Sequence, residues 1–305
     1  MTRVIEKPVF FVGCPRSGTT VIFEAASRHE RLGWPTNYSE MLPAVPALNL
    51  LRRVLDNQWW AVTGRKRQHG RTVFGNRYLP QPDEAYRFWN THAGASFAGN
   101  YLQDEAASDA VVARVRDAVS KTLFWQGRAR FSAKLTGPTR MHFLHSIFPD
   151  ARFVHIVRDG RAVVRSLLRV GFWREGGGLE RPFWQGGLGE NDIRQWQDAG
   201  SDPGILAAMQ WKKIIEVAWA ERESLDAGQY LEVRYEDFVA DPHGVLRGIF
   251  AFSQLDDSQR AHEYVTRGPE LRNRNLRGRD PRDAEYDAVL YDAMEPVISR
   301  LGYRP

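Results

Sequence analysis

Short apolar runs alternate along the chain with stretches whose apolar residues recur at helical spacing. The first run, Val9 to Gly13, predicts a buried strand, and residues 19–29 after it predict a helix. A second strand is expected at 130–135, followed by a helix that ends at Phe148. Later in the chain the pattern predicts strands at 153–157 and 230–235, with helices after Gly160, over 205–228 and after Asp241-Pro242. This alternation predicts an α/β fold, a doubly wound parallel sheet flanked by helices.

Two stretches interrupt the alternation. Residues 35–128 are too long and too aromatic for a simple connection between strands, so we expect an insertion of helices and loops there. Its aromatic side chains predict a pocket that buries a small ligand, or else a second small core. Residues 173–204 are rich in Gly, Trp and Pro with little periodicity, which predicts a long loop acting as a lid. We expect both stretches to belong to one domain that spans residues 1–305.

The charge of the chain favours binding of a small anion. The formal net charge is +5, and only 6 of the 42 basic residues are lysines, which leaves arginine as the main cation. The basic runs at 65–71 and 272–282 have the charge to bind nucleic acid. Neither is interleaved with aromatic residues for base stacking, so a nucleotide or an acidic ligand explains them better. No nucleic-acid partner is therefore expected.

Cysteine usage and the N-terminal segment bear on location. Cys14 is the single cysteine, which excludes an internal disulfide and a cysteine metal cluster. The first apolar run already belongs to the predicted sheet, so we expect no signal peptide. No stretch reaches the ~18 apolar residues of a membrane span. These features predict a soluble, cytoplasmic protein, in which Cys14 packs rather than reacts.

A glycine-bracketed loop follows the first strand. Gly13 and Gly18 have the spacing of a phosphate-binding loop, in which backbone N–H groups and a helix N-terminus point at an anion. Thr19 stands where a nucleotide kinase has its lysine, and Arg16 is the only fixed cation of the loop. Arginine can bind phosphate or sulfonate oxygens through two hydrogen bonds. The loop is therefore predicted to clamp an anion without the lysine of ATP and GTP hydrolysis.

A second anion-binding element is predicted after the strand at 153–157. Arg158 follows this strand at its carboxyl end, where open α/β sheets bind ligands, and Ser166 lies on the helix that comes next. Arg158 has an alternative interpretation as a structural ion pair with Asp159. A solvated helix face is predicted for three arginines that recur every four residues, Arg161, Arg165 and Arg169.

Together the two elements resemble the family of sulfotransferases that use 3′-phosphoadenosine 5′-phosphosulfate (PAPS). That family carries Pro-Arg-Ser-Gly-Thr-Thr behind a strand, as here at 15–20, and a strand-end Arg with a Ser eight residues later, as here at Arg158 and Ser166. The segment 235–242 is similar to a Tyr-Glu-Asp-Leu…Asp-Pro stretch of many members. Residues 294–303 resemble the C-terminal helix of the bacterial and protein-tyrosine branches, to which the chain is closer than to cytosolic small-molecule enzymes.

The resemblance implies a role for each matched residue. The 5′-phosphosulfate side of the donor is implied to lie against Arg16, Ser17, Gly18, Thr19 and Thr20. Arg158 and Ser166 are implied to bind the 3′-phosphate, which distinguishes PAPS from ordinary adenine nucleotides. Asn275 and Arg277 fall where relatives place a loop that closes over the nucleotide.

Sulfonate transfer needs a cation for the leaving group and a base for the acceptor proton. Lys134 is implied to be the cation, because relatives carry a lysine at the end of this strand that touches the leaving oxygen. The Lys-x-His of the cytosolic enzymes is absent, since Lys134 is followed by Leu135 and Thr136. In the protein-tyrosine branch the base is a glutamate that follows the first helix, and Glu40 lies near that place in this sequence. The alternative role for Glu40 is that of an exposed residue that caps the next helix. If Glu40 is not the base, His69 or His92 is the next candidate for that role, ahead of His142 and His145.

The predicted function is transfer of a sulfonate from PAPS to a hydroxyl, or less readily an amine, of a small-molecule or natural-product acceptor, with release of PAP. The cation set is entirely protein-borne, so no metal is expected. A P-loop kinase or nucleotide hydrolase is one alternative, which the missing lysine after Gly18 opposes. A non-catalytic nucleotide-binding module is the other, and it would need neither Lys134 nor Glu40. The acceptor's identity and the oligomeric state stay open.

Overall fold

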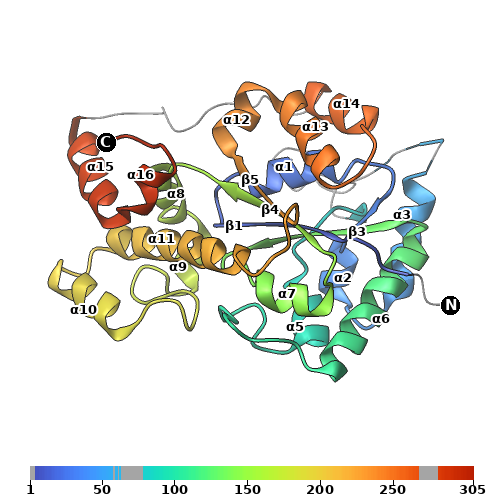
Figure 1. Cartoon of the computed structure of the whole chain (residues 1–305), viewed down its shortest axis with the longest axis horizontal. Helices are drawn as coiled ribbons and strands as arrows, with labels where there is room; N and C mark the ends of the chain where they lie inside the picture. Colours follow the sequence, from blue (N-terminus) through green and yellow to red (C-terminus); the bar gives the residue numbers. More distant parts are fainter. Residues whose placement is uncertain (1–3, 58, 61, 63–77, 268–280) are drawn as a thin grey trace.

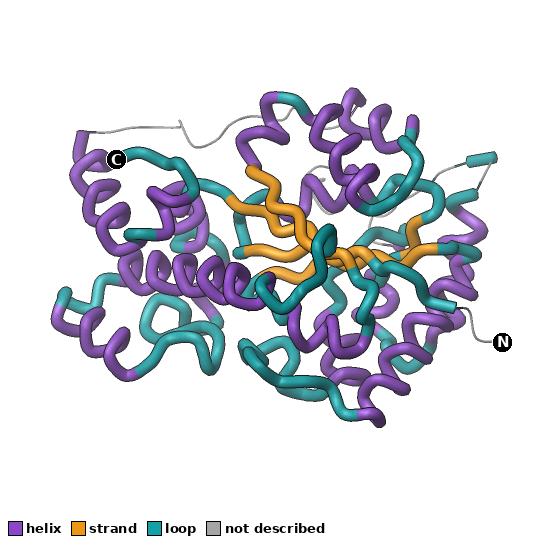
Figure 2. The backbone as a smooth tube through the Cα atoms, in the orientation of Figure 1, coloured by secondary structure: helices purple, strands orange, loops and turns teal. Residues whose placement is uncertain are grey.

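A parallel sheet lies at the centre of the computed structural model, which describes residues 4–57, 59–60, 62, 78–267 and 281–305. Its five strands have the order β2-β3-β1-β4-β5, with helices on both faces (Figure 1, Figure 2). The strands are β1 (Val9–Gly13), β2 (Leu32–Gly33), β3 (Arg130–Thr136), β4 (Arg152–Val157) and β5 (Tyr230–Arg234). The predicted fold class, a doubly wound parallel sheet flanked by helices, is confirmed.

β1 is the central strand, and both of its faces are buried. Phe10 and Val12 belong to one hydrophobic cluster, and Val9 and Phe11 belong to another. Successive side chains of a strand point to opposite faces, so a strand covered on both sides is apolar throughout. β1 pairs with β3 along one edge and with β4 along the other. The continuous apolar run at the start of the chain therefore becomes the axis of the sheet.

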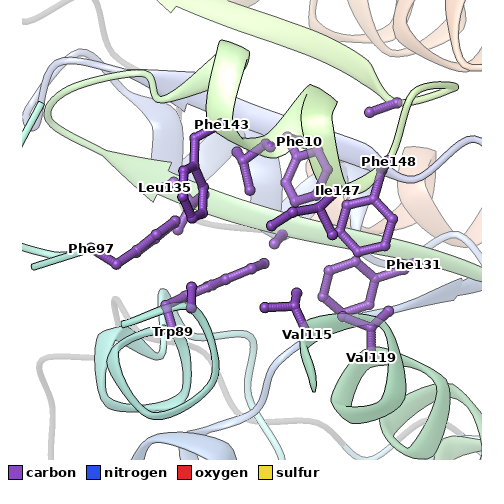
Figure 3. Packing of buried hydrophobic residues seen from close by; sticks show 14 of the residues in the cluster. Phe10, Trp89, Phe97, Val115, Val119, Phe131, Leu135, Phe143, Ile147 and Phe148 are labelled. Carbon is purple, nitrogen blue, oxygen red and sulfur yellow. The ribbon is translucent and has the colours of Figure 1, made fainter. Parts of the chain in front are cut away.

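Helices α5 (Tyr86–Ala93), α6 (Asp109–Gln126) and α7 (Met141–Ile147) cover one face of the sheet. Figure 3 shows Phe10 in the cluster on this face, together with other aromatic rings such as Phe143 and Phe148. The centroid of the Phe10 ring lies 5.7 Å from that of Phe153, 5.9 Å from that of Phe148 and 6.2 Å from that of Trp89. The opposite face is covered by α1 (Thr19–Ala26), α12 (Tyr235–Ala240), α13 (Pro242–Phe252) and α14 (Gln259–Arg267).

A third cluster lies beyond the carboxyl ends of the strands (Figure 1). It joins Cys14 and Val157 to helices α8 (Gly160–Leu167), α9 (Gly171–Glu175), α11 (Pro203–Arg222), α15 (Pro281–Met294) and α16 (Val297–Arg300). The cluster packs the helix that follows Arg158 against the long α11. The element that carries Arg158 and Ser166 is thus held from behind by apolar contacts.

The described parts of the insertion at residues 35–128 are largely helical. Its described elements are α2 (Asn37–Met41), the 3₁₀ helix η1 (Pro46–Asn49), α3 (Leu50–Leu55), α5 and α6. Phe88, Trp89 and Phe97 from this insertion are buried in the cluster around Phe10. These three rings therefore belong to the main core and not to a second small core of their own.

Two predicted elements differ from the structure. Residues 173–204 were expected to be a long loop, but α10 (Glu190–Asp198) lies within them, capped by a bond from the Gly189 N–H to Asp192 and anchored by buried Trp196. Trp196 packs on Leu206 and Met209, so a tertiary contact stabilises a helix with little periodicity of its own. The expected C-terminal helix over 294–303 is divided, because Pro296 has no N–H and separates α15 from α16.

No helix in the described parts of the chain combines the length and the apolar character that crossing a membrane requires.

Replacement of Phe10 by Ala should destabilise the protein by about 3–5 kcal/mol, the usual cost of removing a buried ring. Phe10 is fully buried and its ring has neighbours on several sides, so the cavity cannot be filled by small movements. Urea unfolding followed by circular dichroism measures the loss. Phe172→Ala is the matched control, because Phe172 is 46% exposed, and it should cost far less. Equal losses for the two variants would contradict the packing described.

Candidate active site

Three strand ends meet at the carboxyl edge of the sheet. Gly13 at the end of β1 pairs in register with Thr136 at the end of β3, and the Gly137 N–H donates to the Gly13 carbonyl at 3.0 Å. On the other side of β1, β4 ends at Val157, directly before Arg158. The chain runs from β1 to one half of the sheet and later returns to the other half. Ligands of open α/β sheets bind at such switch points.

The loop between β1 and α1 is shaped around two glycines and one strained residue. A Cβ at Gly13 would lie 2.4 Å from the Ile156 carbonyl oxygen, and one at Gly18 would lie 2.1 Å from the Tyr235 ring. Gly18 also has a φ of +89°, and Arg16 has a φ of +72°, which is uncommon for a residue with a side chain. Such strain concentrates at functional sites, and successive turns of this kind point backbone N–H groups at an anion.

Ser17 adds a polar atom for which the loop provides no partner. Its side chain is 1% exposed, and its Oγ has no hydrogen-bond partner among the described residues. Buried hydroxyls are normally satisfied, so an orphaned one indicates a missing ligand. Gly18 is the N-cap of α1 and offers no side-chain bond to the helix N-terminus. The loop therefore fits an anion that would accept from Ser17 and from the free N–H groups of the first turn.

Arg16 brings the two predicted anion-binding elements together. Its Nε donates to the Ser166 Oγ at 2.8 Å, and its carbonyl accepts from the Arg158 guanidinium at 2.9 Å. Arg16 is exposed at the surface of the loop, whereas Arg158 is 8% exposed. The structure thus places Arg16, Arg158 and Ser166 in one cluster, although 142 residues separate the two arginines in the chain.

Arg158 is a buried cation stacked on an aromatic ring. Its guanidinium carbon lies 4.5 Å from the centroid of the Tyr235 ring, which also closes the space beside Gly18. Burial lowers the pKa of Arg158 from its ordinary value, because desolvation disfavours the charged guanidinium. An anionic ligand at this position would favour the charged form.

The structure also shows how the neighbouring charges of α8 are paired. Asp159 is held by Arg161, whose Nε and guanidinium Nη2 donate to its two oxygens at 3.1 and 3.0 Å. Arg161 is 7% exposed and Arg165 pairs with Asp287, so the predicted solvated stripe is wrong for these two residues. Arg169 is exposed as expected. The sequence pattern missed this because the carboxylates come from a loop and from the distant α15.

Lys134 lies on β3 beside the donor loop and is 2% exposed. Its ammonium donates to the Thr20 Oγ1 at 2.8 Å and lies 3.2 Å from the Glu84 Oε1. A lone lysine at a strand end is usually a solvated edge residue, but this one is buried and joined to α1. The structure therefore places Lys134 at the loop, as the sequence predicted.

Glu84 and Tyr86 complete the site and were missed by the sequence analysis. The Thr136 Oγ1 donates to the Glu84 Oε1 at 2.8 Å, and the Thr136 N–H donates to the Tyr86 hydroxyl at 2.9 Å. Burial raises the pKa of Tyr86 to about 12, so this hydroxyl remains protonated at neutral pH. An acidic residue just before a helix is usually a cap, and no signal in the sequence distinguished Glu84 from one.

Glu40 lies on α2, and its carboxylate contacts the start of α5. The Glu40 Oε2 accepts from the Arg87 N–H at 2.9 Å, its one hydrogen bond within the described residues. The capping role that the sequence analysis left open is therefore present. Glu84, three residues before Arg87, contacts Lys134 instead. The two carboxylates thus lie at the same end of α5, with different partners.

The remaining predicted residues divide into two groups. Cys14 is buried, and burial raises the pKa of its thiol, in keeping with packing rather than reaction. His92 contacts the Pro43 carbonyl at 3.4 Å, and burial lowers its pKa. Three of the predicted candidates, His69, Asn275 and Arg277, lie outside the described residues.

Comparisons with known proteins agree with this geometry. The family model described as "Sulfotransferase family" matches residues 8–259, most of the chain. This chain belongs to the sulfotransferase family. It is 26% identical, over 99% of its own length and 76% of the relative's, to the omega-hydroxy-beta-dihydromenaquinone-9 sulfotransferase Stf3 of Mycobacterium bovis. It is also 26% identical to protein-tyrosine sulfotransferase A of Caenorhabditis elegans, over 53% of this chain and 42% of that protein.

A solved structure shares the fold. Sulfotransferase STF9 from Mycobacterium avium superposes with a TM-score of 0.59 at 19% identity, covering 95% of this chain and 76% of that one. The predicted family is therefore confirmed, and so is the prediction that the protein is an enzyme, a sulfotransferase. The family supports PAPS as the sulfonate donor.

Gly18→Ala should abolish PAP binding and lower stability by more than the usual ~1 kcal/mol for a residue forced to positive φ. The added methyl group would displace the Tyr235 ring on which Arg158 rests. Gly228→Ala is the matched control, because Gly228 has a φ of +87° but open space around it. Calorimetric titration with PAP and thermal melting measure both effects. If both variants bind PAP like the wild type, the close contact at Gly18 does not shape the loop.

Proposed function

We propose that the protein transfers the sulfonate of PAPS to a hydroxyl group of an acceptor and releases PAP. The observation that carries the proposal is the cluster in which Arg16 contacts both Arg158 and Ser166, beside the link from Lys134 to Thr20. A donor with phosphate at both its 5′ and 3′ positions matches two anion-binding elements that meet through Arg16. Adenine nucleotides without a 3′-phosphate would leave the second element unused.

The donor loop binds the 5′-phosphosulfate in this proposal. Arg16, Ser17, Gly18, Thr19 and Thr20 supply the cation, hydroxyls and N–H groups, and the orphaned Ser17 Oγ gains a partner. Arg158 and Ser166 bind the 3′-phosphate. The bond from Arg16 to Ser166 then rearranges to make room for phosphate oxygens on both sides. Asn275 and Arg277 stay predictions for the closing loop.

Lys134 stabilises the charge that develops on the leaving oxygen. Transfer breaks the bond between sulfur and the 5′-phosphate oxygen, and negative charge grows on that oxygen. The Lys134 ammonium is desolvated and anchored to Thr20 in the first turn of α1, so it needs little reorganisation. A carboxylate then removes the acceptor's proton, and two are available at the start of α5, Glu40 and Glu84.

The acceptor class follows from the insertion and from a relative. The Mycobacterium bovis relative is named for a hydroxylated menaquinone, a largely apolar acceptor. In this chain Met41 and Leu42, the two residues after Glu40, are 60% and 51% exposed, although large apolar side chains are normally buried. We therefore propose a hydroxyl on an apolar molecule as the acceptor. Amines are the less favoured alternative.

Incubation with ³⁵S-labelled PAPS and primary alcohols of increasing chain length tests the activity directly. We expect labelled sulfate esters, a rate that rises from 1-butanol to 1-dodecanol, and PAP in equal amount. EDTA should leave the transfer largely intact, whereas a kinase-type enzyme depends on Mg²⁺ to bridge the phosphates. Activity lost on chelation and restored by Mg²⁺ would favour the P-loop kinase alternative. Tight PAP binding without any turnover would favour the non-catalytic module.

Arg158→Ala should weaken PAP binding by about 1.5–3 kcal/mol, the usual worth of hydrogen bonds to charged groups. Binding of adenosine 5′-phosphosulfate, which has no 3′-phosphate, should change much less. Isothermal calorimetry with both ligands measures the difference, and Ser166→Ala should show the same selectivity with a smaller loss. Because Arg158 also holds the Arg16 carbonyl, equal losses for the two ligands would indicate damage to the loop rather than recognition of the 3′-phosphate.

A further inference from the structure

We propose that Glu84 is the general base that takes the proton of the acceptor hydroxyl, an inference that rests on the proposed function. Its carboxylate contacts Lys134, and through Lys134 it is connected to Thr20 on the donor loop. Glu40, the base implied by the family resemblance, instead accepts a backbone N–H of α5. The structure thus gives the two carboxylates different roles, with Glu84 beside the reacting groups and Glu40 in support of the helix.

The position of Glu84 is fixed by its neighbours on both sides. Its Oε1 accepts from the Thr136 hydroxyl at 2.8 Å and lies 3.2 Å from the Lys134 ammonium. The next residue, Ala85, is fully buried with a φ of +52°, and Tyr86 is bonded to the backbone of Thr136 through its hydroxyl. A base must be held within hydrogen-bond reach of the proton it removes, and these contacts leave the segment little freedom.

Glu84 also remains accessible to an acceptor. Its side chain is 21% exposed, whereas that of Lys134 is 2% exposed. An acceptor that approaches from the side of the insertion therefore meets the carboxylate before the buried ammonium.

The bonds and protons of the step balance without a further reactant. The acceptor oxygen forms a bond to sulfur, and its proton goes to the Glu84 carboxylate. The bond between sulfur and the 5′-phosphate oxygen breaks, and its electron pair stays on PAP. As charge grows on that oxygen, the anchored Lys134 ammonium interacts more strongly with it and its pairing with Glu84 weakens, which makes the carboxylate a better proton acceptor at that moment. One ammonium thus couples loss of the leaving group to removal of the proton.

Glu84→Gln tests the proposal, because the amide keeps the shape and can still accept from Thr136 and Lys134. Acceptor acidity provides the diagnostic comparison. With 1-dodecanol, whose proton must be removed, kcat should fall by roughly 10²–10⁴, the usual contribution of a positioned base. With 4-nitrophenol, which is ionised at pH 8, the rate should be almost unchanged. The acidic limb of the pH profile for 1-dodecanol should disappear as well.

Three control variants are measured with the same two acceptors. Glu190→Gln alters a carboxylate that is 94% exposed on α10 and should change nothing. Lys134→Ala should slow transfer to both acceptors, because it acts on the leaving group. Glu40→Gln should have a small effect that is equal for the two acceptors, since its amide oxygen can still accept from Arg87. PAP affinity and melting temperature, measured for every variant, report binding and folding independently of turnover.

Each outcome leads to one conclusion. A loss with 1-dodecanol but not with 4-nitrophenol in Glu84→Gln supports the proposal, and the same pattern in Glu40→Gln instead would overturn it. Equal loss with both acceptors would make Glu84 a positioning residue for Lys134 and also overturn it. If neither acceptor is used, the effect of Glu84→Gln is measured on the hydrolysis of PAPS to PAP and sulfate in the absence of an acceptor. Water must also lose a proton when it attacks, so this hydrolysis tests the same role of Glu84. A wild-type protein that does not bind PAP would instead refute the proposed function.

Discussion

The parallel pairing of β1 with β3 and β4 is the constraint on which the site depends. It brings the carboxyl ends of three strands to one edge, so that a loop near residue 16, a lysine at 134 and an arginine at 158 become neighbours. The pairing is fixed in turn by β1 being apolar on both faces, since a shift of one residue would exchange the two clusters that cover it. The packing of the core therefore also determines where the charged residues of the site are placed.

The site holds its cations in place by different means. Lys134 is kept by Thr20 and Glu84, whereas Arg158 lies over the Tyr235 ring and bonds the Arg16 carbonyl. Burying charges is costly unless partners or ligands compensate them, so an anion bound beside these cations would lower that cost. The hydrophobic cluster behind α8 holds that helix in place, and the hydrogen bond from the Arg87 N–H to Glu40 caps the start of α5. Such preorganisation is what electrostatic catalysis requires.

The sheet and the donor loop could be predicted because their signals are local. A continuous apolar run, two glycines at fixed spacing and an arginine at a strand end are visible in short windows of sequence. Glu84 was not predictable in this way, since its significance comes from Thr136 and Lys134, about fifty residues later in the chain. The same limit explains Arg165, whose partner Asp287 lies on α15. Arg161 pairs with Asp159 only two residues earlier, but Asp159 precedes the helix, so helical spacing does not reveal the contact. α10 is stabilised by packing of its Trp196 on Leu206 and Met209 of α11, and periodicity carries no information about such contacts.

The Tyr235 ring has a consequence for how this site can change during evolution. The ring occupies the space that a side chain at position 18 would need, and its face supports Arg158. A larger residue at 18 becomes tolerable only if the ring at 235 shrinks, but a smaller residue there would remove the support of the arginine. The three positions are therefore epistatic, and no single substitution among them leaves the other two unaffected.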